Sequence, residues 1–127
     1  DKIADMNRDI ISYAMDSLGI RTQVIRLSET KAGGAGTGLL VNLCRTLEAD
    51  GFLTFRSAWK YLDEGLFRRA GIETLAIEPP EIVYPQLWSD FVPNLSVFDL
   101  LFTCGPKSRE ILQRGRHKVR CADSVAH

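Results

Sequence analysis

Residues 51–77, GFLTFRSAWKYLDEGLFRRAGIETLAI, decide the fold that we predict for this chain. Residues 51–55 and 72–77 are short runs of β-branched, aromatic and apolar side chains, as is typical of strands. Between them, apolar residues recur at helical spacing from Trp59 to Ala70, and Gly71 is placed to end the helix. A strand, a helix and a second strand in this order predict a parallel pair joined by a right-handed crossover.

The upstream residues extend this alternation. Residues 22–27 predict another strand, and apolar side chains from Leu39 to Leu47 predict another helix. We therefore predict an α/β fold with a small three-layer sheet of about three parallel strands and crossover helices. The edge strands of so small a sheet have unpaired backbone N–H and C=O groups that further strands or a partner must pair or cover. We therefore expect the sheet to be half of a larger α/β fold. Before the first predicted strand, we expect an amphipathic helix over about residues 3–18, which Gly19 ends. Apolar side chains recur there at helical spacing: Ile3, Met6, Ile10, Ala14 and Leu18.

The downstream residues predict a loop and two short helices. Prolines and aromatic side chains dominate residues 78–93, which favours an ordered, non-helical loop. Ser96 and Asp99 form a capping-box pattern before an apolar helix, and Pro106 is placed in the first turn of a last helix through Ser108, Ile111 and Leu112. We expect a single α/β domain over residues 1–114 and a basic, disordered tail over residues 115–127.

Composition excludes several classes of protein. The 127 residues are 45% hydrophobic, with 16 basic and 16 acidic side chains, which suits one globular domain. Zero net charge argues against nucleic acid or an anionic membrane as the partner. No run approaches the ~20 apolar residues of a membrane span, and no signal peptide is evident, so we expect a cytoplasmic protein. Three scattered cysteines and two histidines predict no disulfide framework, no metal site and no cofactor.

A glycine-rich segment at residues 31–38 is the first candidate site. It lies between a predicted strand and a predicted helix, where helix N–H groups and the helix dipole favour an anion. We name Gly34, Gly36 and Thr37 as candidate anion-binding residues. The segment lacks the third glycine of a dinucleotide fingerprint and the lysine–serine ending of a phosphate-binding loop, so a flexible crossover loop is the alternative.

The proline-rich loop is the second candidate site. Tyr84, Gln86 and Asp90 supply a phenol, an amide and a carboxylate at what would be the C-terminal side of the third strand, where ligands collect in α/β folds. We name these three as candidate catalytic residues. The alternative is a loop that covers a sheet edge with its aromatic side chains. We interpret Asp99 as a helix cap rather than a general base.

Several motifs resemble the C-terminal half of the WbqC-like protein family, over roughly residues 5–112. The most specific is residues 91–102, FVPNLSVFDLLF, followed by Cys104-Gly105-Pro106. The others are Leu40-Val41-Asn42-Leu43-Cys44, Ala49-Asp50, Tyr61-Leu62-Asp63-Glu64 with Leu66-Phe67, Ala70-Gly71-Ile72 and Tyr84-Pro85-Gln86. The resemblance implies a role in surface-polysaccharide or natural-product biosynthesis, with transfer of an acyl or aminoacyl group to an amine.

The chain also departs from that family. Family members are about twice as long, and the half that carries the histidine-glutamine-proline and proline-tryptophan-leucine-glycine patterns is absent. The serine-glycine-proline turn after the second strand reads Thr54-Phe55-Arg56-Ser57-Ala58, and a histidine-proline pair reads Glu81-Ile82. Phe55 and Arg56 would fill or recharge a pocket that glycine and proline leave open. We name Arg56 as a further candidate for binding an anion.

These observations lead to a hypothesis of function. Because the chain begins with Asp1 and enters a helix at once, we expect a trimmed or cleaved piece of a longer product. We expect one component of a split or heteromeric enzyme that acts at a small-molecule amine, by acyl or aminoacyl transfer or by ring closure with loss of an anionic leaving group. The alternative is a non-catalytic stabilising subunit on a catalytic partner chain, with Trp59, Trp88, Phe91 and Phe98 as interface anchors.

Overall fold

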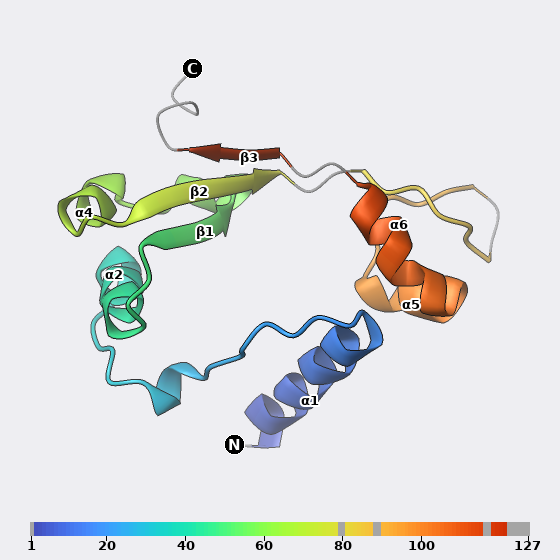
Figure 1. The fold of residues 1–127 in the computed structure, drawn as a ribbon, viewed down its shortest axis with the longest axis horizontal. Coiled ribbons are helices and arrows are strands. Elements are labelled where there is room, and N and C mark those ends of the chain that lie inside the picture. The colour runs from blue at the N-terminus through green and yellow to red at the C-terminus, as the bar shows by residue number, and fades with distance from the viewer. Residues whose placement is uncertain (1, 79–80, 88–89, 116–117, 122–127) are drawn as a thin grey trace. The chain divides into compact units, whose positions relative to one another are not determined.

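The computed structural model describes residues 2–78, 81–87, 90–115 and 118–121, the last four by their backbone. Internal contacts divide the chain into two compact units (Figure 1). The first unit contains residues 1–23 and 80–116, and the second contains residues 24–79 and 117–127. A single domain over residues 1–114 stays a prediction.

The second unit holds a three-stranded sheet in the order β1-β2-β3. Strand β1 (Gly51–Phe55) pairs in parallel with β2 (Glu73–Glu78), from Gly51 opposite Glu73 to Phe55 opposite Ile77. Figure 1 shows β2 between β1 and β3 (Lys118–Cys121), which is antiparallel to β2. The parallel pair and its helical crossover confirm the α/β class that the sequence predicts.

The third strand differs from our prediction. Residues 20–26 lie in no helix or strand and lead into a short 3-10 helix, η1 (Leu27–Glu29), so the predicted strand over residues 22–27 is wrong. The two units divide after residue 23, so this apolar run connects them, and its exposed Val24 and Ile25 have no strand beside them in the described part of the sheet. The third strand is instead β3, within the segment for which we expected a disordered tail.

Among its described residues, the second unit has three α-helices beside the sheet. Helix α2 (Gly36–Thr46) follows the glycine-rich segment as predicted. The single helix that we predicted before β2 is divided into α3 (Arg56–Trp59) and α4 (Glu64–Arg69). Between α3 and α4, the backbone N–H of Asp63 donates to the Thr37 hydroxyl at 3.1 Å instead of to a carbonyl one turn earlier in the chain. This bond explains why the predicted helix is interrupted there.

The core of the second unit is formed by Val41, Cys44, Phe67 and Ile72. Phe67 is fully buried, and its ring stacks on that of Phe52 with centroids 4.9 Å apart. Burial of each such side chain contributes roughly 1.5–3 kcal/mol to folding. This core fixes α2 and α4 against the parallel strands.

The described residues of the first unit form helices and loops and contain no strand. It contains α1 (Lys2–Ser17), α5 (Val97–Cys104), the 3-10 helix η2 (Gly105–Lys107) and α6 (Ser108–Arg114). Gly19, at φ +64°, ends α1 as predicted, with the N–H of Ile20 donating to the carbonyl of Met15 at 2.8 Å. None of the helices described in either unit is long and apolar enough to cross a membrane.

Candidate functional site

The loop between β2 and α5 belongs to the first unit and carries all three predicted catalytic residues, of which Tyr84 and Gln86 form side-chain hydrogen bonds. The Gln86 side-chain amide pairs with the backbone of Val92 like a neighbouring strand. Its Nε2 donates to the Val92 carbonyl, and its Oε1 accepts from the Val92 N–H, both at 2.8 Å. Because both ends of the amide are engaged, Gln86 positions the loop.

Tyr84 and Asp99 form a hydrogen-bonded pair. The Tyr84 hydroxyl donates to Oδ2 of Asp99 at 2.8 Å, and both side chains are half-buried. The ring of Phe91 meets the Tyr84 ring edge-on, with centroids 5.8 Å apart. The loop and α5 are thus joined through a phenol and a carboxylate.

The first turn of α5 explains the position of Asp99. Ser96 is the N-cap, and its hydroxyl accepts from the N–H of Phe98 at 3.3 Å. Ser96 therefore caps the helix as predicted, whereas the Asp99 carboxylate accepts from Tyr84. A carboxylate in the first turn is also favoured by the positive end of the helix dipole.

The surroundings of Tyr84 hold its hydroxyl in the protonated state. Burial raises the pKa of Tyr84 above its ordinary value of 10.0, and the hydrogen bond to Asp99 raises that pKa further. The bond requires the phenol proton, so ionisation of Tyr84 would break it. At neutral pH the hydroxyl therefore stays a donor to the carboxylate.

A hollow of about 170 Å³ lies beside this pair. Tyr84, Asn94 and Ser96 supply its polar groups, and its apolar lining is formed by Ile82, Leu95, Val97, Leu100 and Leu112. Asn94 has φ +59°, a left-handed conformation that asparagine tolerates better than most residues. A mostly apolar lining with a few polar groups is common in small-molecule sites, although this hollow is smaller than the roughly 300–1,000 Å³ of most ligand pockets.

Sequence reasoning missed Asn94 and Asp99 as site residues. The Pro93-Asn94 pair is a turn signal, which could have indicated the left-handed residue that lines the hollow. The capping pattern led us to interpret Asp99 as a helix cap, and no local spacing shows that Tyr84, fifteen residues away, bonds to it. Only tertiary structure supplies that contact.

Asp90 and the predicted aromatic anchors have different surroundings. Asp90 is exposed in the loop, and Trp88 lies outside the described residues. Trp59 is 9% exposed, and its Nε1 donates to the Glu64 carboxylate, so it is a core side chain rather than the interface anchor we considered. Phe98 lies near Tyr13, with ring centroids 6.3 Å apart.

The predicted anion-binding residues lie in the second unit. Gly34 and Gly36 have φ of +116° and +53°, which explains why glycine stands at both positions before α2. The Thr37 hydroxyl accepts from the N–H of Asp63. Arg56 forms an ion pair with Glu78 at the end of β2. Their role in binding an anion stays a prediction.

The two predicted sets of site residues do not share a unit. Tyr84, Gln86 and Asp90 belong to the first unit, whereas Arg56 and the glycine-rich segment belong to the second. Within the part of the chain that the structure describes, no group of three or more His, Cys, Asp or Glu side chains could hold a metal ion. The Tyr84–Asp99 pair and the hollow beside it form a candidate site that lies within the first unit.

Comparison with known proteins gives one family and one curated relative. The model of the WbqC-like protein family matches residues 1–111. An uncharacterized protein of Mycobacterium tuberculosis is 29% identical over 109 residues, which cover 85% of this chain and 47% of that protein. The chain thus spans about half the length of the curated relative it matches. No solved structure matches the chain.

Proposed function

Since the chain belongs to the WbqC-like protein family, we propose that it contributes an amine-binding site to an enzyme that transfers an acyl or aminoacyl group to that amine. The observation that carries the proposal is the bond between the Tyr84 hydroxyl and the Asp99 carboxylate beside a small hollow. An amino sugar or an amino acid is the class of substrate that fits this chemistry.

The carboxylate supplies the charge that an amine requires. An ionised carboxylate has about four acceptor positions, of which the Tyr84 hydroxyl occupies one. A protonated amine can donate to the others in charge-assisted hydrogen bonds, which are roughly twice as strong as neutral ones. Asn94 and Ser96, which line the hollow together with Tyr84, can bind hydroxyl or carbonyl groups of the same molecule.

In the proposed reaction, Asp99 takes up the proton that the amine loses. The amine must lose a proton to become a nucleophile, and that proton passes to the carboxylate. The nitrogen then forms a bond to the acyl carbon, and the bond from that carbon to its leaving group breaks. The leaving group departs with the electron pair. Ring closure by the same nitrogen, with loss of an anionic group from carbon, would use the same proton transfer.

The other predicted residues have supporting roles in this proposal. Gln86 holds the loop through Val92 and is a positioning residue. We also propose that Gly34, Gly36, Thr37 and Arg56 bind an anion within the second unit, where Arg56 forms an ion pair with Glu78. We further propose that a second protein chain completes the enzyme.

A stabilising subunit is the second candidate function. In this second proposal the side chains of Val83, Leu87 and Phe102, each at least three-quarters exposed, contact the catalytic partner chain. A stabilising subunit requires no small molecule in the hollow. A test of amine binding at this hollow therefore distinguishes between the two proposed functions.

Titration with a small amine tests the proposal. D-glucosamine is added to the labelled full chain while the amide and carboxyl NMR signals of Tyr84, Asn94 and Asp99 are followed. D-glucose, which lacks the amine, is the matched control. We expect saturable shifts around Asp99 with glucosamine and none with glucose. Equal responses to the two sugars, or none at these residues, would contradict an amine site.

A further inference from the structure

Helix α1 exposes an apolar stripe along most of its length. Ile3, Met6, Ile10 and Tyr13 are 67%, 55%, 43% and 56% exposed, and no residue of the helix is buried. An isolated helix of this length is marginal in water and takes its stability mainly from packing of its apolar face. The stripe therefore needs a cover.

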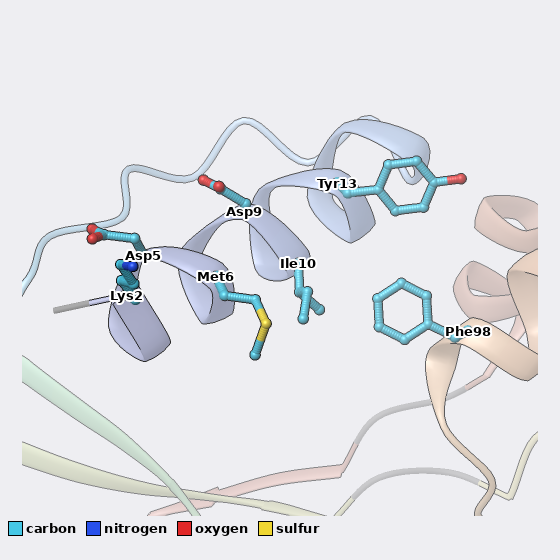
Figure 2. A pocket seen from close by; sticks show the side chains of 7 residues that line it. All are labelled: Lys2, Asp5, Met6, Asp9, Ile10, Tyr13 and Phe98. Atoms are coloured by element: carbon cyan, nitrogen blue, oxygen red, sulfur yellow. The ribbon is translucent and has the colours of Figure 1, made fainter.

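The stripe borders a wide hollow of about 510 Å³. Figure 2 shows Met6 and Ile10 on one side of α1, Asp5 and Asp9 pointing away from them, and Phe98 of α5 opposite Tyr13. Apolar side chains of a partner helix could enter beside Met6 and Ile10. The helix thus has both an apolar ridge and room for another ridge.

The spacing of the stripe is that of a coiled-coil seam. Positions 3, 6, 10 and 13 follow intervals of three, four and three, which are the a and d positions of a heptad. This spacing reads the same from either end. In an antiparallel pair of two α1 helices, Ile3 faces Tyr13 of the second copy and Met6 faces its Ile10.

The charges beside the seam complement one another in the same arrangement. Lys2 and Asp16 occupy the same flank of α1, two heptads apart, so antiparallel pairing sets Lys2 of each copy beside Asp16 of the other. Asp16 lies 3.8 Å from Arg21 in its own chain, but both side chains are strongly exposed and such pairs exchange readily. Asp9 would approach its own copy, and Arg8, 3.6 Å away, offsets that repulsion.

We propose that α1 is a dimerisation helix, which pairs its stripe in antiparallel orientation with the stripe of a second copy of this chain. The two copies are related by a two-fold axis, so each contact is made twice. This surface is separate from the hollow beside Tyr84 and Asp99, and the inference does not rest on the proposed function.

The mass of the full chain in solution tests this pairing. Light scattering on a size-exclusion column is expected to give twice the chain mass of 14.2 kDa. Ile10→Lys should weaken the dimer by roughly a hundredfold or more, because a charge replaces an apolar side chain at two symmetric places. Ile11→Lys is the matched control, since Ile11 is similarly exposed, at 49%, but lies off the stripe.

Exchanging the charges of Lys2 and Asp16 tests the antiparallel orientation of the two helices. Lys2→Asp and Asp16→Lys should each weaken the dimer by about tenfold, because two attractive pairs become repulsive. The double variant restores opposite charges and should recover the wild-type dimer. Circular dichroism is the control that checks whether each variant retains its helices.

Three results would overturn the proposal. These are a monomeric wild-type chain, a dimer that survives Ile10→Lys, and a particle in which a different protein covers the stripe. Failure of the double variant to recover the dimer would overturn the antiparallel arrangement.

Discussion

Arg109 holds the end of α1 at Gly19. Its Nη1 donates to the carbonyl oxygens of Gly19 at 2.8 Å and of Leu18 at 3.0 Å. These carbonyls lie at the C-terminus of α1, where a cation is favoured by the helix dipole. One guanidinium on α6 therefore joins two parts of the first unit that are ninety residues apart in sequence.

Gly19→Ala should cost more stability than the same change at another helix end. A Cβ at Gly19 would come within 2.2 Å of Arg109 Nη1, and the φ of +64° is itself unfavourable for alanine. Gly71, at φ +71°, has no atom within 4 Å of such a Cβ. We expect Gly71→Ala to lower the free energy of unfolding by about 1–2 kcal/mol and Gly19→Ala by about 1 kcal/mol more.

Urea unfolding of both variants, each in the native and the Arg109→Ala background, measures the difference. The additional cost of Gly19→Ala should disappear without Arg109, and equal costs of the two variants in the native background would contradict the contact.

Glu48→Gly should stabilise the chain. Glu48 ends α2 at φ +53°, where the N–H of Ala49 donates to the Cys44 carbonyl at 2.8 Å in the arrangement that usually places glycine at this position. We expect a gain of about 0.5–1 kcal/mol in the free energy of unfolding, from the urea midpoint. Glu48→Ala keeps the unfavourable φ and should give no gain, so a similar gain in both variants would point to charge instead.

Ser108→Ala should destabilise the first unit. Ser108 is fully buried, and its hydroxyl lies 3.1 Å from the Leu100 carbonyl and 2.7 Å from the Gly105 carbonyl, at the junction of α5 and α6. Removing the hydroxyl leaves buried acceptors without this donor, at a cost of about 1–3 kcal/mol. The exposed Ser12 is the control, and thermal unfolding of Ser12→Ala should match the wild type.

Alkaline titration should distinguish Tyr84 from an exposed tyrosine. The pKa of Tyr84 is raised in the folded chain by burial and by its bond to Asp99, so the folded state binds this proton more tightly than the unfolded state. Its contribution to stability is therefore present below pH 10 and is lost as the pH rises through the folded pKa.

The phenolate absorbance of the wild type minus that of Tyr84→Phe gives the titration curve of Tyr84 alone. In Asp99→Asn this curve should move toward lower pH, and an unchanged curve would contradict the hydrogen bond between Tyr84 and Asp99. Tyr61→Phe, at a side chain that is 76% exposed, is the control.

Local signals in the sequence were sufficient for much of the fold. The periodicity of α1 and α2, the glycines that end α1 and α4 and the Ser96 cap all depend on neighbouring residues, and the structure confirms them. The strand over residues 22–27 was wrong because an apolar run shows that a segment can be extended but does not show that a strand lies beside it. Strand β3 was missed for the converse reason, since a short basic segment becomes a strand through its pairing with β2.

The candidate site was predictable only in its loop. The prolines and aromatic residues marked the segment that carries Tyr84 and Gln86, but the acid paired with Tyr84 is Asp99 on α5 rather than Asp90 in the loop. Asp90 resembled a functional residue by its position, and Asp99 resembled a cap by its spacing. Which carboxylate meets the phenol depends on how α5 packs, and no short pattern encodes it.

The comparison of Asp99→Asn with Asp90→Asn tests the central claim most directly. Both changes remove one carboxylate charge from the same unit, and only Asp99 bonds to Tyr84. Glucosamine affinity, measured by NMR titration, should fall by about tenfold or more in Asp99→Asn and stay at the wild-type value in Asp90→Asn. Loss of binding in Asp90→Asn with retention in Asp99→Asn would contradict an amine site at the Tyr84–Asp99 pair.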